Sequence, residues 1–402
     1  MSEAPPLADL RVLDCTDELG VYASKLLADL GADVIRLEPP TGDPMRHFPP
    51  FANETRQVSL YFAHFNAGKR SVTLDLEQPG SRDRLRCLIG TCNAVVESGP
   101  VGELLSTRLG GAWLAESRPN LVLVSVTPFG REGPGAAQSG GDLVVAARSG
   151  LLWLNGRPDG PPFRPGGEQA AHMASLVAAN ATLLGLFDQQ RTGRGCQIDV
   201  PAVFAASLAT LQTANANYAT WHGRVPARRG MGTLPISRHI FPAADGWVAL
   251  TALPGQWEKL VRTLQAHGAA AELADPVFLD ADHRMERGEH INDVIEAFTR
   301  QRPKQYLFET LQRAGVACAP VNTVEDLAGD PFLRDHGFFR ELEHPELGQT
   351  LAHPGAPFHL RGRKVGPQKA APVLGEDNEA IWMRELGMTA DTFAARRQGG
   401  VL

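Results

Sequence analysis

The stretch LRVLDCTDELGVYASKLLADLGADVIRLE, residues 10–38, decides the fold. It begins with a short apolar run, Leu10–Asp14, which is typical of a buried strand. Apolar residues at helical spacing follow in Leu19–Leu30, and Asp33–Glu38 has the pattern of a second strand. A strand, a helix and a strand in this order predict a βαβ unit with two parallel strands.

The same alternation continues beyond this unit. Ser71–Leu76 is strand-like, Ser81–Ile89 has a helical pattern, and Ala94–Glu97 is again strand-like. Leu121–Val126 is a nearly continuous apolar run, which suits a parallel strand buried on both faces. We therefore expect residues 1–130 to form a doubly wound α/β sheet.

After residue 130 the sequence changes to a loop and one long helix. Residues 150–168 are rich in Gly, Pro and Arg and are expected to form a loop. Glu168–Gln189 is predicted to be a helix of small residues, a composition that lets another backbone approach closely. Cys196–Val200 is predicted to be a further strand.

Residues 225–325 differ from the preceding segments in composition and periodicity and are expected to form a smaller second domain. A basic, Gly-rich loop, RVPARRGMGT, precedes a hairpin-like stretch, Arg238–Thr251, around Asp245-Gly246. Amphipathic helices are predicted from there to about residue 316. The tail from residue 330 is Pro-rich and has little periodicity, so we expect it to be loop-rich.

Length and composition exclude several classes of protein. The chain has 402 residues, which is longer than a chain that folds around a single hydrophobic core usually is. Its net charge of -6 argues against a nucleic-acid binder. No apolar run approaches the length of a membrane span, and the first residues do not have the pattern of a signal peptide. The five cysteines are scattered, which disfavours zinc and disulfide scaffolds. A cytoplasmic enzyme with reduced cysteines is the expected class.

The turn after the first strand does not carry a dinucleotide-binding motif. Its sequence, TDELGV at Thr16–Val21, is not G-x-G-x-x-G. The side chains of this turn would prevent a pyrophosphate from approaching the backbone as closely as it does at a glycine-rich turn. P-loop, nucleophile-elbow and zincin motifs do not occur, and no two histidines are spaced to bind a metal from one helix face. Lys69, Arg70 and Arg108 lie near expected strand ends, where they suit a phosphorylated ligand or are solvated surface charges.

Seven phrases of the sequence, taken together, resemble the family III CoA-transferases. This is the CaiB/BaiF type, which includes formyl-CoA transferases and α-methylacyl-CoA racemases. The phrases occur in the family's order and cover nearly the whole chain. They are LADLRVLDCT, LLADLGADVIRLEPPTGDPMR, YFAHFNAGKRSVTLDL, RPNLVLVSVTPFGREGP, LLGLFDQQRTGRGCQIDV, APVNTVEDLAGDPFLRDHGFF and APVLGED.

The resemblance implies an α/β fold in which a doubly wound parallel sheet forms a large domain built from both ends of the chain. Residues 1–205 and 330–402 would form this CoA-binding domain, residues 225–325 would form the small domain, and linkers would join them. The resemblance also implies a dimer of two subunits threaded through one another like linked rings. The small-residue helix and the long linkers fit such an arrangement.

The transferase chemistry implied by the resemblance depends on an aspartate. This aspartate attacks a CoA thioester to form an anhydride, and the CoA thiolate then returns to give an aspartyl-CoA thioester in a site shielded from water. In an ungapped alignment with the family pattern its place falls on Ala171, and a methyl group cannot attack a thioester. The racemase histidine would fall near Gly141-Asp142, and Asp142 is not an expected substitute.

Other departures from the family concern the CoA pocket and the dimer contact. The family phrase E-N-F-x-P-G is Glu97-Ser98-Gly99-Pro100 here, and the usual glutamine after R-T-G-R-G is Cys196. Five residues still match CoA-side positions, and each is a candidate for CoA binding or for a purely structural role: Arg46, Tyr61, Lys69, Leu74 and Arg108.

Two residues near Ala171 are candidates to replace the missing nucleophile. Glu168 lies about one helical turn before Ala171, although the helix dipole alone also favours an acid in a first turn. His172 is expected to point about 100° away on an ideal helix and to serve packing. Four arginines are candidates to meet a second carboxylate of the acid substrate or to be surface charges: Arg164, Arg228, Arg229 and Arg238.

We therefore expect a subunit of a family III CoA-transferase that moves CoA between an acyl-CoA donor, with succinyl-CoA as a candidate, and a carboxylic acid. A related chain that carries the aspartate would be its partner, as in benzylsuccinate CoA-transferase; otherwise the chain would form a homodimer. CoA or acyl-CoA is expected as a substrate, without a covalently bound cofactor, a metal, nucleic acid or a membrane. The alternatives are a homodimeric racemase, lyase or transferase that uses a different acid, and a CoA-binding protein without activity.

Overall fold

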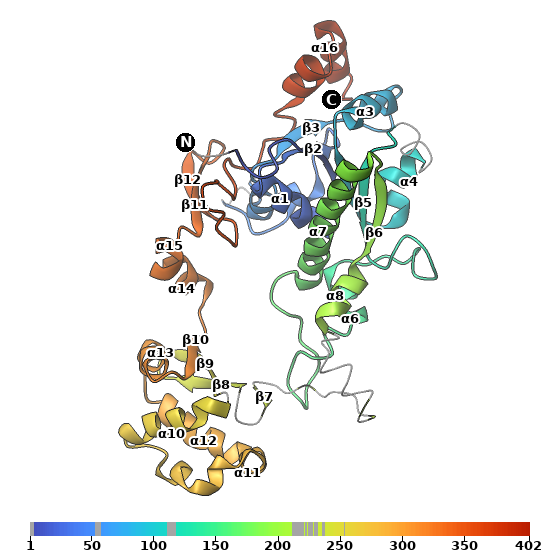
Figure 1. Cartoon of the computed structure of the whole chain (residues 1–402). Helices are drawn as coiled ribbons and strands as arrows, with labels where there is room; N and C mark the ends of the chain where they lie inside the picture. Colours follow the sequence, from blue (N-terminus) through green and yellow to red (C-terminus); the bar gives the residue numbers. More distant parts are fainter. Residues whose placement is uncertain are drawn as a thin grey trace. The chain divides into compact units, whose positions relative to one another are not determined.

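The computed structural model describes residues 4–52, 58–110, 118–210, 232–234, 238–252 and 254–402, together with Trp221, Gly223 and Arg228. The chain divides into two compact units, which are coloured along the sequence in Figure 1. The large unit consists of residues 1–151, 165–217 and 332–402, and the small unit of residues 152–164 and 218–331. Both ends of the chain thus belong to the large unit, whereas residues 152–164 belong to the small one.

A six-stranded parallel sheet forms the centre of the large unit, in the order β3-β2-β1-β4-β5-β6. Its strands are β1 Arg11–Cys15, β2 Asp33–Glu38, β3 Arg70–Thr73, β4 Ala94–Ser98, β5 Val122–Thr127 and β6 Cys196–Pro201. β4 and β5 are buried along their whole length, as in a sheet covered on both faces. The strand order reverses beside β1, so the doubly wound parallel sheet predicted from the βαβ pattern is confirmed.

The helices of the large unit connect these strands. They are α1 Val21–Asp29, α2 Leu60–Phe65, α3 Ser81–Gly90, α4 Leu105–Leu109, α6 Asp142–Arg148, α7 Gln169–Thr192 and α8 Ala202–Thr210, with a 3-10 turn at Pro44–His47. The long helix α7 runs along β5 and β6 and also contacts α1 and α8 (Figure 1). A Cβ atom at Gly185 would lie only 2.7 Å from Cγ1 of Val122, so α7 needs a glycine there to approach β5.

α7 is apolar on all sides, but its two faces differ in the size of their side chains. The small residues are buried within the large unit, including Ala171, Ala174 and Ala178. Larger side chains point to the outside, and Leu184 and Phe187 are 68% and 64% exposed. The small residues therefore allow α7 to pack closely against other elements of the same chain.

By length and composition α7 also passes as a membrane span, so the expectation that no apolar stretch is long enough is wrong. Half of its apolar window is buried inside the protein. Its contacts with β5, β6 and α1 are those of a core helix of the large unit.

The C-terminal tail is more structured than its weak periodicity indicates. α14 Val324–Gly329 precedes the tail, which contains α15 Pro331–Asp335, the antiparallel hairpin of β11 Phe339–His344 and β12 Gln349–Pro354, a π-helix at Glu379–Glu385, and α16 Ala390–Gln398. Trp382 and Phe393 pack in the same core cluster as Leu13 and Ile35 of the sheet. Residues 355–377 contain no helix or named strand, as expected of a loop-rich tail, whereas the short elements are not predicted because they show no clear period.

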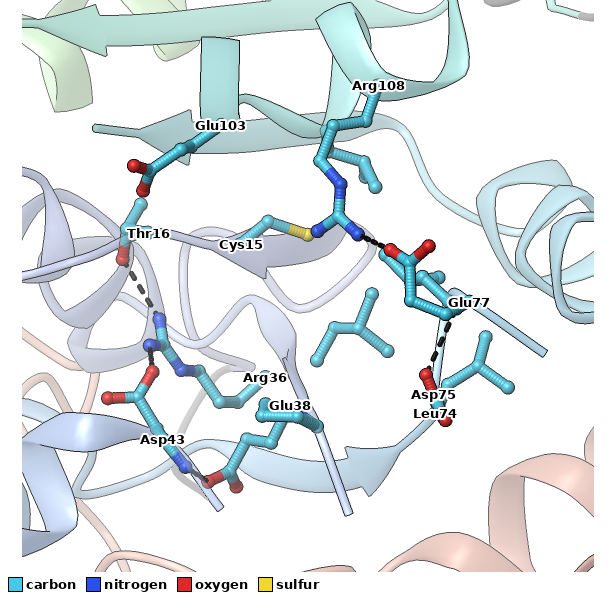
Figure 2. Close-up of a pocket in the computed structure, with 14 residues that line it drawn as sticks. Cys15, Thr16, Arg36, Glu38, Asp43, Leu74, Asp75, Glu77, Glu103 and Arg108 are labelled. Atoms are coloured by element: carbon cyan, nitrogen blue, oxygen red, sulfur yellow. Dashed lines mark hydrogen bonds and ion pairs between the residues drawn. The ribbon is translucent and has the colours of Figure 1, made fainter. Parts of the chain in front are cut away.

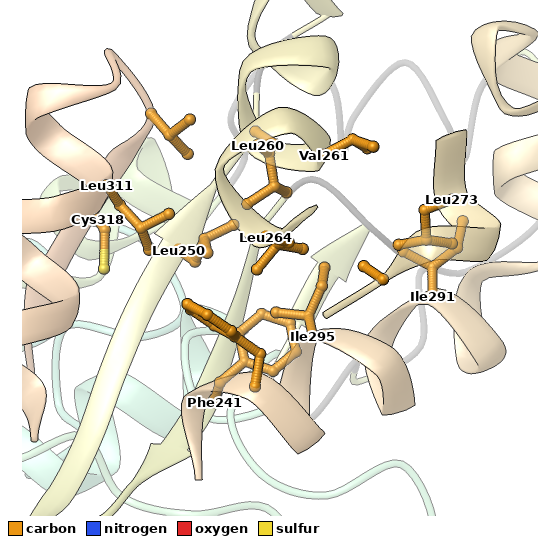
Figure 3. Close-up of a cluster of buried hydrophobic side chains, with 14 of the residues drawn as sticks. Phe241, Leu250, Leu260, Val261, Leu264, Leu273, Ile291, Ile295, Leu311 and Cys318 are labelled. Atoms are coloured by element: carbon orange, nitrogen blue, oxygen red, sulfur yellow. The ribbon is translucent and has the colours of Figure 1, made fainter. Parts of the chain in front are cut away.

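The small unit combines an antiparallel sheet with helices. The sheet has the order β10-β9-β8-β7, with β7 Gly232–Leu234, β8 Arg238–Ala243, β9 Gly246–Thr251 and β10 Ala317–Pro320. The helices are α10 Trp257–Ala266, α11 Ala281–Glu286, α12 Gly288–Thr299 and α13 Lys304–Arg313. Figure 3 shows their shared core around Phe241, Leu250, Leu264 and Ile295. The predicted hairpin around Asp245-Gly246 is confirmed.

Candidate functional site

A cavity of about 360 Å³ opens at the carboxyl ends of β1, β2 and β3 (Figure 2). Open α/β sheets bind ligands at this edge, next to the point where the strand order reverses. Thr16 follows β1, Glu38 ends β2, and Leu74 follows β3, while Leu105 and Arg108 come from α4. Of the five residues predicted to contact CoA, Leu74 and Arg108 line this pocket.

A network of buried charges lies beside the pocket. Arg36 donates to the carboxylate of Asp14 over 2.9 Å, and the ammonium group of Lys69 donates to the second oxygen of this carboxylate over 2.7 Å. Lys69 also donates to Ser24 (2.8 Å) and Asn66 (3.0 Å), and its side chain is fully buried. Burial lowers the pKa of Lys69 to about 8, although the charge of Asp14 opposes this change. The structure therefore places Lys69 inside the protein and not in the pocket lining.

Arg46 acts on the pocket through Glu38. Its Nε and Nη2 atoms donate to the two carboxylate oxygens of Glu38 over 2.6 and 2.7 Å, and its guanidinium lies 3.9 Å from the ring centre of Phe62. Burial opposes ionisation of Glu38, but the hydrogen bonds and charge of Arg46 lower its pKa overall. Such a bidentate pair fixes the position of a carboxylate, so Arg46 holds one residue of the pocket lining in place.

The rim of the pocket carries an exposed ion pair. Arg108 of α4 is paired with Glu77, which lies in the connection between β3 and α3 (Figure 2). Their side chains are 43% and 78% exposed, respectively. An exposed pair of this kind contributes little to stability, so Arg108 remains accessible to an anionic ligand.

Ala171 lies in the first turn of α7 and is only 1% exposed. The carboxylate of Asp142, at the start of α6, accepts hydrogen bonds from the backbone N–H groups of Ala170 (2.9 Å) and Ala171 (3.2 Å). Asp142 thus satisfies two N–H groups that the helix itself leaves without an intrahelical partner. One turn further along, the hydroxyl of Ser175 donates to the carbonyl oxygen of Leu19 over 3.2 Å. The Ala171 face of α7 therefore packs against the turn between β1 and α1.

Two glutamates lie near the start of α7. Glu168 directly precedes the helix, and its carboxylate accepts a hydrogen bond from the hydroxyl of Tyr61 over 2.7 Å. Burial and this hydrogen bond raise the pKa of Tyr61, which keeps the hydroxyl protonated as the donor. Glu18 lies in the turn between β1 and α1, and a Cβ atom at Gly141 would be 3.9 Å from its Oε1. Burial and the charges of Asp17 and Glu168 raise the pKa of Glu18.

His172 faces an aromatic group rather than the acids. Its ring centre lies 5.2 Å from that of Tyr22 and 5.8 Å from that of Phe65. Burial lowers its pKa, although the charges of Glu168 and Asp142 oppose this, so the ring is held towards its neutral form. This placement agrees with the packing role predicted for it.

The four arginines proposed to meet a second carboxylate do not form a common group in the described residues. Arg228 donates to the carbonyl oxygens of Arg157 and Gly160, and its guanidinium lies 4.9 Å from the ring centre of Trp153. Arg229 lies outside the described residues, as does the side chain of Arg238 at the start of β8. Arg164 lies in the small unit. Within the described part of the chain, no group of three or more His, Cys, Asp or Glu residues is placed to hold a metal ion.

Sequence reasoning missed Glu18 and the capping role of Asp142. An acid in the turn after the first strand of a doubly wound sheet was the available signal for Glu18, because this turn borders the ligand-binding edge. For Asp142 there was no local signal, since the residue caps a helix that begins 27 residues later.

The geometry agrees with comparisons to known proteins. Residues 7–378 match the model of CoA-transferase family III. A subunit of the succinyl-CoA:(R)-benzylsuccinate CoA-transferase of Thauera aromatica is 38% identical over 381 residues, which are 92% of this chain and 92% of that protein. The succinyl-CoA:mesaconate CoA-transferase of Haloarcula hispanica is 30% identical over 395 residues, which are 96% of this chain and 98% of that protein.

A solved structure extends the match to three dimensions. The crystal structure of a CaiB/BaiF family protein from Brucella suis has a TM-score of 0.83 at 28% identity, and the match covers 96% of this chain and 100% of that one. Family, relatives and structure agree with the resemblance found in the sequence. The chain therefore belongs to CoA-transferase family III, as a CoA-transferase or as part of one.

Proposed function

We propose that this chain is the non-catalytic subunit of a heteromeric CoA-transferase that moves CoA from succinyl-CoA to a carboxylic acid. The observation that carries the proposal is Ala171, a buried methyl group in the first turn of α7. The aspartate mechanism implied by the family resemblance needs a carboxylate nucleophile at this place. A second chain must then supply it.

The acids around Ala171 are poorly suited to replace that nucleophile. The carboxylate of Asp142 is engaged by two backbone N–H groups, and that of Glu168 by Tyr61. Burial and the charges of Asp17 and Glu168 raise the pKa of Glu18, so its carboxylate takes up a proton more readily than that of a free glutamate. Asp142 and Glu168 are thus already engaged in the structure, and Glu18 is more easily protonated than a free glutamate.

CoA is proposed to bind in the pocket at the carboxyl ends of β1–β3. Leu74 offers an apolar wall, and Arg108 offers a guanidinium to the pyrophosphate. Arg46 contributes by holding Glu38, while Lys69 and Tyr61 serve the structure through Asp14 and Glu168.

The partner is proposed to be a related chain, interlocked with this one. A helix that is apolar all round is normally buried, yet α7 exposes Leu184 and Phe187. The neighbouring helix α8 exposes Phe204 (66%) and Leu208 (74%), one turn apart. Exposed apolar side chains gathered on two packed helices support a surface that another subunit covers. The similarity to a protein named as a subunit points to a heteromer.

The acceptor is proposed to be a dicarboxylic acid. The most similar relatives reported above are named for benzylsuccinate and mesaconate, which both carry two carboxylates, and both names give succinyl-CoA as the donor. Their shared chemistry is transfer of CoA between dicarboxylic acids.

The decisive experiment compares the purified chain with a complex. The chain alone should not transfer CoA from succinyl-CoA, whereas co-expression with a related chain that carries the aspartate should give a heteromer that does. Full activity of this chain alone would refute the proposal. If the chain binds CoA but transfers none, both alone and in every complex, it would instead be a CoA-binding protein without activity.

A second candidate function is a homomeric acyl-CoA racemase, lyase or transferase that uses a different acid. It is supported by Glu18, an acid in the turn between β1 and α1 whose pKa is raised, since a carboxyl with a raised pKa can act as a general acid. If the chain alone turns over an acyl-CoA, Glu18→Gln and Glu168→Gln should each abolish turnover. Unchanged turnover in both variants would remove this candidate.

A further inference from the structure

A second cavity, of about 510 Å³, adjoins the pocket at the carboxyl ends of β1–β3. The two cavities share Leu76 and Glu77, so the β3–α3 connection forms a wall between them. Arg82 and Arg86 of α3 line the second cavity, and both side chains are exposed. Because they are four residues apart, they lie on the same face of α3.

Arginines from three helices lie around the N-terminal end of α3. Arg82 donates to the carbonyl oxygen of Arg108 over 3.3 Å, which brings α3 next to α4. A Cβ atom at Gly80 would lie 3.0 Å from Nη2 of Arg396, which comes from α16. Together with Arg86, these arginines concentrate positive charge in a chain whose net charge is -6.

Two acids border the same cavity, and their ion pairs with the arginines are exposed to solvent. Asp83 lies 3.9 Å from Arg86, at the outer limit of an ion pair, and both side chains are at least half exposed. Glu77 pairs with Arg108 at the boundary of the two cavities (Figure 2). Since an exposed pair is worth at most about 1 kcal/mol, a phosphate can displace Glu77 from Arg108.

We infer that the second cavity binds the 3′-phosphate of CoA, with Arg82 and Arg86 as its donors. This rests on the proposed CoA site in the first pocket. CoA carries a pyrophosphate and a separate phosphate on the same ribose, so its site needs cations at two neighbouring positions. Arg108 serves the pyrophosphate in the first pocket, and the α3 arginines serve the 3′-phosphate across the shared wall. Paired guanidinium groups match the planar sets of oxygen acceptors that a phosphate offers.

The test compares CoA with 3′-dephospho-CoA by calorimetry. The wild-type chain should bind CoA on the order of tenfold more tightly, as expected for charge-assisted hydrogen bonds at an exposed site. Arg82→Gln/Arg86→Gln should abolish this preference while leaving the affinity for 3′-dephospho-CoA unchanged. Arg262→Gln/Arg313→Gln, in α10 and α13 of the small unit, makes the same change of net charge elsewhere and should keep the preference.

Three outcomes would overturn the inference. They are equal affinity of the wild-type chain for both ligands, a preference that survives Arg82→Gln/Arg86→Gln, and loss of the preference in the control variant as well. In each of these cases CoA still binds, so the proposed function stands. A folded chain that binds neither ligand would overturn both this inference and the proposed CoA site.

Discussion

The hydroxyl of Tyr61 donates a hydrogen bond to the carboxylate of Glu168 over 2.7 Å, and this contact joins α2 to the start of α7. The sequence suggests separate roles for the two residues, Tyr61 towards CoA and Glu168 as a substitute nucleophile. In the structure the Tyr61 hydroxyl and the Glu168 carboxylate are hydrogen-bond partners of one another. The bond also fixes the first turn of α7, in which Ala171 stands beside the turn between β1 and α1.

Tyr61→Phe should destabilise the large unit. The change removes a hydrogen bond to a charged and partly buried acceptor, so we expect the free energy of unfolding to fall by roughly 1.5–3 kcal/mol. Tyr306→Phe is the matched control, because Tyr306 is 40% exposed in the small unit. Urea unfolding measures both variants, and equal effects would contradict a specific role of the Tyr61–Glu168 bond.

Lys69→Met and Arg108→Gln should change different properties. Lys69→Met leaves the buried carboxylate of Asp14 with fewer partners and should cost about 3 kcal/mol of stability. Arg108→Gln affects an exposed side chain and should change stability by less than about 0.5 kcal/mol, while weakening CoA binding roughly tenfold. Unfolding curves and calorimetry separate the two effects. A stable Lys69→Met variant that no longer binds CoA would show instead that Lys69 contacts the ligand.

A buried pair of histidines should make the stability depend on pH. The Nε2 atoms of His344 and His353, on β11 and β12, are 2.7 Å apart, and both side chains are buried. One ring must donate and the other accept, so the accepting ring must be neutral and the bond is lost when both rings are protonated. Burial lowers the pKa of both, and the charges of His344 and Lys25 help to bring His353 to about 4. His64 of α2 faces the same group, and burial together with the charge of Lys25 lowers its pKa to about 3.

The sign of the pH effect follows from these lowered values. A histidine of the unfolded chain takes up a proton near pH 6.5, whereas His353 in the folded protein does so only near pH 4. The stability that depends on neutral His353 is therefore full above about pH 6.5 and is lost as the pH falls, by roughly 2–3 kcal/mol at pH 4.5. His353→Gln should flatten this dependence, and His290→Gln, at an exposed site, should not. Identical pH profiles of unfolding for both variants would refute the assignment.

The sequence is informative where packing is local. Asp33–Glu38 is predicted with the bounds that β2 has, and the hairpin around Asp245-Gly246 is predicted from a two-residue turn. In both cases period and turn chemistry are set by residues next to one another. The short elements of the tail show no clear period, and Trp382 packs in a core cluster with strands near the other end of the chain, so these elements are not predicted although the tail is correctly expected to be loop-rich.

The candidate site is less predictable because its contacts join distant segments. Five residues match CoA-side positions by type, but the sequence does not show that Lys69 is buried against Asp14 or that Tyr61 bonds Glu168. Glu18 reaches the Ala171 region only because Ser175 docks α7 on Leu19. Local patterns identify which residues are polar, whereas the fold decides which of them face a ligand.

The exposed apolar face of α7 should be required for association. Leu184→Glu/Phe187→Glu places two charges on a surface that a partner subunit is proposed to cover, which is costly to bury. We expect sedimentation to show loss of the oligomer, with unchanged circular dichroism. Leu279→Glu, at a position 59% exposed in the small unit, is the control. An unchanged oligomer in the α7 variant would place the subunit contact elsewhere.

Ala171→Asp should restore the missing nucleophile in this chain. The first turn of α7 favours an anion because its backbone N–H groups carry partial positive charge, while Glu18 and Glu168 nearby raise the pKa of a new carboxyl. We expect the purified variant to transfer CoA from succinyl-CoA above background and to gain the mass of bound CoA as an aspartyl thioester. Ala171→Asn has nearly the same shape without a nucleophilic carboxylate and should remain inactive. A folded Ala171→Asp variant that binds CoA but transfers none would show that the loss of activity has a second cause in this subunit.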